Sequence, residues 1–120
     1  MYNNTEKFWD DIFEKEKLKD LSAPFGIEKL DSCIDWLCAN TGSIIDYGCG
    51  NASMLLRCAY LNVKKGLGID ISCQAVRTAV DYISKKDLLG FSVIQGSLEA
   101  LKSIKDASFE GAILSNIIDN

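Results

Sequence analysis

The sequence contains no histidine, only one proline and no excess of positive charge. Without histidine, neither a Ser-His nor a Cys-His nucleophile pair can be assembled, and the commonest zinc ligand is missing. The 13 Lys and Arg against 17 Asp and Glu give a net charge of −4, which disfavours nucleic acid as a partner. Whatever chemistry the chain performs must therefore use other groups.

Long hydrophobic runs are also absent. No apolar run approaches the ~18 residues of a membrane-spanning helix, and the N-terminus lacks the basic-then-apolar order of a signal peptide. The five cysteines are odd in number and none is spaced as CxxC, so we expect neither a disulfide framework nor a metal site. These features predict a cytoplasmic protein without a membrane partner.

The composition that remains, 48% hydrophobic and 25% charged over 120 residues, suits one globular core. Residues 5–19 and 27–39 carry apolar side chains at helical spacing, which predicts two amphipathic helices. Both precede any strand. We therefore expect residues 1–42 to form an N-terminal helical cap.

From Ser43 onward, short apolar runs alternate with helical stretches. Strands are predicted at 43–47, 66–70, 91–95 and 109–115, and helices at about 52–61, after Ser72, and near 97–103. The residues of the middle helix that we expect to point inward are Val76, Ala79, Val80 and Ile83. This alternation is typical of parallel βαβ units, so the predicted fold class is α/β, with a Rossmann-like parallel sheet.

The turn after the first predicted strand contains two glycines, Gly48 and Gly50. Glycines let the chain turn sharply and let a ligand approach the backbone N–H groups of a helix N-terminus. Asp70 follows 20 residues after Gly50, at the end of the second strand. A carboxylate there can accept hydrogen bonds from both hydroxyl groups of a ribose. Together they predict a nucleoside site. The alternative is a plain tight turn with solvated acids.

Four segments resemble, in order, the motifs of class I S-adenosylmethionine-dependent methyltransferases. They are residues 44–50, 68–72, 95–101 and 109–116. In the first, Asp46 stands two residues before Gly48, at a position where dinucleotide-binding enzymes usually lack an acid. The resemblance covers about residues 43–118 and implies a sheet of about four strands in the order 3-2-1-4.

The resemblance also implies a role for each site residue. Asp46 would hold the methionine ammonium of S-adenosylmethionine, while Gly48, Cys49 and Gly50 give room for the tail of this cofactor. Asp70 would accept the ribose hydroxyls. The remaining implied contacts are an adenine sandwich of Ile71 and Leu98, a polar neighbour in Ser97, and the strand-four residues Ser115 and Asn116.

Some of these residues have simpler interpretations. The alternative for Ile71 and Leu98 is a place in the core, for Ser97 a helix N-cap, and for Cys49 a small space-filling side chain. Ala52 stands where the family commonly has a third glycine. We expect this to be a mild change, because alanine still permits close packing of helix and strand. No catalytic residue is identified.

The chain reaches fewer strands than a full class I sheet has. Residues 43–120 are therefore interpreted as a truncated cofactor-binding half-domain, whose last strand would be an apolar edge open to self-association. The expected function is methyl transfer to an unidentified small-molecule acceptor. The alternatives are an NAD(P)-binding oxidoreductase half-domain and a non-catalytic fragment that binds a nucleoside.

Overall fold

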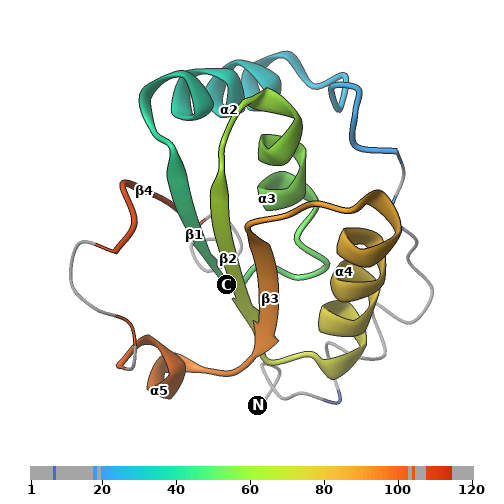
Figure 1. The fold of residues 1–120 in the computed structure, drawn as a ribbon, viewed down its shortest axis with the longest axis vertical. Coiled ribbons are helices and arrows are strands. Elements are labelled where there is room, and N and C mark those ends of the chain that lie inside the picture. The colour runs from blue at the N-terminus through green and yellow to red at the C-terminus, as the bar shows by residue number, and fades with distance from the viewer. Residues whose placement is uncertain (1–6, 8–17, 19, 103, 105–107, 115–120) are drawn as a thin grey trace.

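The computed structural model describes residues 7, 18, 20–102, 104 and 108–114 (Figure 1). The helix predicted at 5–19 lies outside the described residues, apart from Lys7 and Leu18. In chain order the elements are α2 (Glu28–Asn40), β1 (Ser43–Tyr47), α3 (Ser53–Cys58), the 3-10 turn η1 (Ala59–Leu61), β2 (Lys65–Asp70), α4 (Cys73–Lys86), β3 (Phe91–Gln95), α5 (Leu98–Leu101) and β4 (Gly111–Ile113).

The four strands form one parallel sheet in the order β3-β2-β1-β4. Ile44 of β1 lies opposite Gly66 of β2 on one side and Gly111 of β4 on the other. The strands run in the same direction, so their carboxyl ends meet at one edge of the sheet, at the bottom of Figure 1. The predicted α/β, Rossmann-like fold and its strand order are confirmed.

Close packing between β2 and its neighbours holds one face of the sheet against the helices. Figure 1 shows α3 and α4 together on one side of the strands. Helix α2 lies at the top, near the amino ends of the strands. A Cβ added at Gly66 would lie 2.5 Å from the ring of Phe91 and 3.1 Å from Leu55 of α3. Leu55 and Leu56 are fully buried there. Glycine in β2 therefore allows strand, helix and ring to share one layer of the core.

The segment before β1 packs into this same core. Leu21 is buried, its N–H donates to the hydroxyl of Tyr82 at 2.9 Å, and its carbonyl accepts from Arg57 Nη1 at 3.0 Å. Ile34 and Cys38 of α2 belong to the same cluster of buried residues. Residues 21–40 are thus held to the core by apolar packing and, at Leu21, by hydrogen bonds to α3 and α4.

The apolar face of α4 differs from the expected one. Val80 is 47% exposed, and the buried positions are Ala75, Ala79 and Tyr82. The expectation that Val80 points inward is therefore wrong. Tyr82 is buried instead because its hydroxyl has partners in Leu21 and Tyr60.

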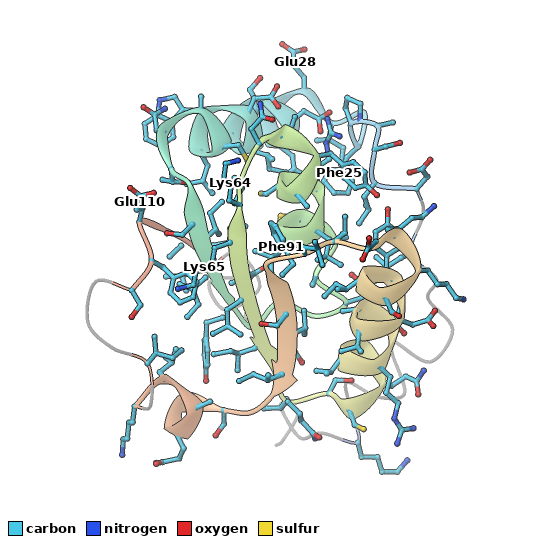
Figure 2. All side chains as sticks on the ribbon, in the orientation of Figure 1. Phe25, Glu28, Lys64, Lys65, Phe91 and Glu110 are labelled. Atoms are coloured by element: carbon cyan, nitrogen blue, oxygen red, sulfur yellow. The ribbon has the colours of Figure 1, made fainter. Side chains whose placement is uncertain are left out.

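The segment leading into β4 is fixed beside the start of β1. Glu110 accepts a hydrogen bond of 2.6 Å from the N–H of Gly42, and its own N–H donates to the carbonyl of Ser43 at 3.2 Å. Figure 2 shows Glu110 and Lys65 on the side of the sheet away from α4. The ammonium of Lys65 lies 4.6 Å from the ring centre of Phe109.

Among the residues that the structure describes, no helix is both long enough and apolar enough to cross a bilayer.

Candidate functional site

The glycine turn after β1 is tied to the end of β2. Gly48 and Gly50 have φ values of 76° and 59°, in the left-handed region that glycine adopts without strain. The N–H groups of Gly48 and Cys49 both donate to the carbonyl of Ile69, at 2.7 and 3.0 Å. The turn is thereby held over the carboxyl edge of the sheet.

Asp70 joins the first strand-to-helix turn to the second. Its Oδ2 accepts from the N–H of Gly50 at 2.7 Å, and its Oδ1 accepts from the N–H of Ser72 at 2.9 Å. The residue is 9% exposed. Because a carboxylate has about four lone-pair sites, Asp70 keeps acceptor capacity beyond these two bonds. The structure thus brings Gly50 and Asp70 together, as their spacing suggested.

Asp46, in the neighbouring strand β1, carries a buried carboxyl group. It is 2% exposed, and its Oδ2 has no hydrogen-bond partner. Burial raises the pKa of Asp46 to about 8, and the negative charge of Asp70 adds to the rise. A buried polar atom without a partner costs about 1–3 kcal/mol. This arrangement suits a cation or a strong donor brought in from outside the chain.

Cys49 lies between the two glycines and is buried. Its thiol donates to the carbonyl of Gly50 at 3.4 Å. Burial raises the pKa of Cys49, and the charges of Asp46 and Asp70 raise it further. A thiol that keeps its proton is a poor nucleophile, so Cys49 acts here by filling space within the turn.

Ala52 is the N-cap residue of α3 and adopts a left-handed conformation, with φ at 65°. An alanine in this region carries a steric cost of about 1–2 kcal/mol that glycine avoids. The expectation of a mild change considered only the space between helix and strand. Ala52 is fully buried, and the backbone angle at this position favours glycine.

The residues expected around adenine are less completely described. Ile71 is half-buried at the end of β2, and its carbonyl accepts from Gln95 Nε2 at 3.1 Å. Ser97 is exposed at the N-cap position of α5, and its side chain makes no capping hydrogen bond. Leu98 begins α5, whereas Ser115 and Asn116 lie outside the described residues. Their contacts with a cofactor stay predictions.

Three polar residues that support the site were not singled out as site residues from the sequence. Asn51 Oδ1 accepts from the N–H of Ser53 at 3.2 Å, which shapes the entry into α3. Gln95 links the end of β3 to Ile71, and Ser72, which caps α4 by accepting from the N–H of Ala75, also donates its N–H to Asp70. For Asn51 the signal was present, because asparagine before a helix often makes this local bond.

Comparison with known proteins places the glycine turn within a known type of domain. A family model described as a methyltransferase domain matches residues 39–120. No curated protein sequence matches the chain.

Solved structures with the same fold cover most of the chain. YcgJ from Bacillus subtilis is 23% identical, with a TM-score of 0.62 over 72% of this chain and 37% of YcgJ. PH0226 from Pyrococcus horikoshii OT3 is 20% identical, with a TM-score of 0.65 over 85% of this chain and 49% of that one. PKMT2 from Rickettsia typhi, solved in complex with AdoHcy, is 24% identical, with a TM-score of 0.52 over 62% of this chain and 14% of PKMT2. The chain thus spans less than half the length of each.

Proposed function

This chain belongs to the methyltransferase domain family, and from that membership we propose that it binds S-adenosylmethionine and serves methyl transfer to a small-molecule acceptor. The AdoHcy complex of PKMT2 supports the choice of cofactor, because PKMT2 contains a region with the fold of this chain. AdoHcy, S-adenosylhomocysteine, is what S-adenosylmethionine becomes once its methyl group has left.

The observation that carries the proposal is the buried carboxyl group of Asp46 beside the glycine turn. A dinucleotide would bring the negative charges of a pyrophosphate to this turn, close to Asp46, whereas Asp70 would accept hydrogen bonds from ribose hydroxyls with either cofactor. S-adenosylmethionine instead brings an ammonium and a sulfonium. The acid Asp46 at the mouth of the turn therefore favours the cationic cofactor over NAD.

Each part of the cofactor has a chain group suited to it. Asp70 has free lone pairs for the ribose hydroxyls, and the Gly48–Gly50 turn offers backbone without obstructing side chains for the methionine tail. Asp46 has an unpartnered oxygen for the ammonium. We propose the adenine contacts of Ile71, Leu98 and Ser97, and the strand-four contacts of Ser115 and Asn116, on the resemblance of motifs alone.

The cofactor supplies a methyl group that is already electrophilic because it is bonded to a sulfonium. The chain then has to hold the methyl donor in line with the nucleophile and keep water out. Such positioning can contribute up to roughly 7–11 kcal/mol in favourable intramolecular reactions. No general base is obligatory for this chemistry, and we assign none.

The charge of the chain supports a small acceptor over a polyanion. With a net charge of −4, the chain lacks the positive field that draws nucleic acids to a surface. We name no particular acceptor, because every residue proposed for the site is assigned to the cofactor.

Isothermal titration calorimetry of the 120-residue chain with S-adenosylhomocysteine and, separately, with NAD tests the proposal. We expect binding of S-adenosylhomocysteine and none of NAD. The Asp70→Ala variant should lose most of this binding, whereas Asp81→Asn, at an exposed pair with Lys85, should retain it. Binding of NAD alone would support an oxidoreductase half-domain, and binding of neither would support an inert fragment. Either result would overturn the proposal.

A further inference from the structure

Asp46 and Asp70 project from the same face of the sheet. Asp46 lies opposite Gly68 in the register of β1 and β2, and Asp70 follows Gly68 by two residues. Side chains two apart on a strand point to the same face. A Cβ on Gly68 would lie 2.9 Å from Cys49 Sγ and 3.2 Å from Leu55, so this is the face covered by the turn and α3.

Among the described residues, the groups that interact electrostatically with Asp46 are acids or neutral thiols. They are Asp70 from β2, Cys49 from the glycine turn and Cys58 from α3. Burial raises the pKa of both thiols, so they remain neutral in the physiological range. None of these three groups can offset a negative charge on Asp46.

The two acids differ in their hydrogen bonding. Both oxygens of Asp70 accept hydrogen bonds from backbone N–H groups. Asp46 Oδ2 is buried and accepts none. With burial and the charge of Asp70 raising the pKa of Asp46 to about 8, its carboxyl group holds a proton at neutral pH while the site is empty.

We infer that binding of an ammonium-bearing cofactor releases the proton of Asp46, so that cofactor binding and deprotonation of this buried acid are one coupled step. The inference rests on the proposed function, because it needs a ligand whose cation reaches Asp46. In the step, the O–H bond of the carboxyl group breaks, its proton leaves to solvent, and the carboxylate pairs with the ammonium. The ligand keeps its own proton.

This coupling has a pH signature with a definite sign. Below the pKa of the empty site, the protein must first lose a proton, so affinity for an ammonium-bearing ligand rises about tenfold for each pH unit. The rise flattens near pH 8, where Asp46 is already ionised before binding. A nucleoside without the amino-acid tail makes no demand on Asp46, and its affinity should change little with pH.

The test compares two ligands on the unaltered chain. S-adenosylhomocysteine carries the ammonium, and 5′-methylthioadenosine has the same nucleoside and sulfur without it. Calorimetry at pH 6 and pH 7 should show about a tenfold gain in affinity for the first and less than a twofold change for the second. Titration at pH 7 in buffers of different ionisation enthalpy should show release of about one proton with S-adenosylhomocysteine.

The Asp46→Asn variant isolates the source of that proton, because asparagine has the shape of the acid but does not titrate. Its proton release should fall to near zero, while its affinity for 5′-methylthioadenosine stays within about threefold of the unaltered chain. If S-adenosylhomocysteine binds with equal affinity at both pH values, or if the variant releases the same proton, the coupling is wrong and the proposed function stands. If it does not bind at any pH, the proposed function itself fails.

Discussion

The carboxylate of Asp70 accepts a 2.7 Å hydrogen bond from the backbone N–H of Gly50, which joins the ends of β1 and β2 across the candidate site. A second bond, from the N–H of Ser72, reaches the start of α4. Asp70 therefore has two roles, because the residue proposed to hold the ribose also fixes the glycine turn that the methionine tail would cross. Binding and local stability are coupled through one side chain.

The first prediction concerns the replacement of Asp70. Asp70→Ala leaves the N–H groups of Gly50 and Ser72 without their acceptor, at about 1–3 kcal/mol for each such group that stays buried. We expect a lower free energy of unfolding in urea and, in the folded fraction, at least a tenfold weaker affinity for S-adenosylhomocysteine. Asp81→Asn is the control for the loss of one charge. Unchanged affinity for S-adenosylhomocysteine in a folded Asp70→Ala protein would show that the ribose does not bind at Asp70.

The second prediction concerns Asp46 and the stability of the ligand-free chain. The pKa of Asp46 is about 8 in the folded chain and near ~4 when unfolded, so the folded state favours the protonated acid. The resulting stabilisation is complete below about pH 4 and is lost as pH rises through 8. Asp46→Asn should therefore be more stable than the unaltered chain at pH 8, by up to roughly 5 kcal/mol for a shift of about four pKa units, and nearly equal to it at pH 4. Urea unfolding at both pH values measures the difference, and parallel stability curves would contradict the prediction.

The sheet could be predicted because its signals are local. β1 and β3 are short runs rich in apolar and aromatic residues between polar or glycine-containing segments, whereas the order of the strands was implied by the resemblance of the motifs. The inward face of α4 was predicted less well. Val80 and Ile83 have the right spacing, but the hydroxyl partners of Tyr82 come from residues 22 and 61 positions away in the sequence. No local pattern contains that information.

The candidate site was predicted in its residue types more than in its bonds. The spacing and the strand ends predicted one nucleoside site for Gly50 and Asp70, and the structure joins these two residues by a hydrogen bond. The sequence could not show that Asp46 Oδ2 lacks a hydrogen-bond partner, because burial and missing hydrogen bonds are properties of the packed chain. The left-handed angle of Ala52 was likewise hidden, because an alanine gives no sequence signal for positive φ.

The third prediction concerns the contact between Gly68 and the turn. In Gly68→Ala the new Cβ would lie 2.9 Å from Cys49 Sγ and 3.2 Å from Leu55 and Val93. We expect a loss of about 1–3 kcal/mol in the free energy of unfolding, as in other overpacked cores. Adding Cys49→Ala removes the nearest atom and should recover part of the loss. Gly42→Ala is the matched control, because its Cβ would meet only the exposed carboxylate of Glu110, at 3.3 Å. Strict additivity of the two substitutions would show that Gly68 and Cys49 do not press on one another.

The last prediction concerns the edge of the sheet at β4. Among the described strands, β4 pairs only with β1, so its outer backbone groups have no strand partner there, and Leu114 beside it is 47% exposed. Unpaired apolar edges promote pairing with a second chain. We expect light scattering on the 120-residue chain to show dimers or larger species that grow with concentration.

Ala112→Lys, at an exposed position of β4, should shift the population toward monomer, because a charge on an edge strand opposes pairing. Ser92→Lys places the same charge on β3, the opposite edge, and should leave the association unchanged. A monomer at all concentrations, or association that responds only to Ser92→Lys, would show that β4 is not the surface that pairs.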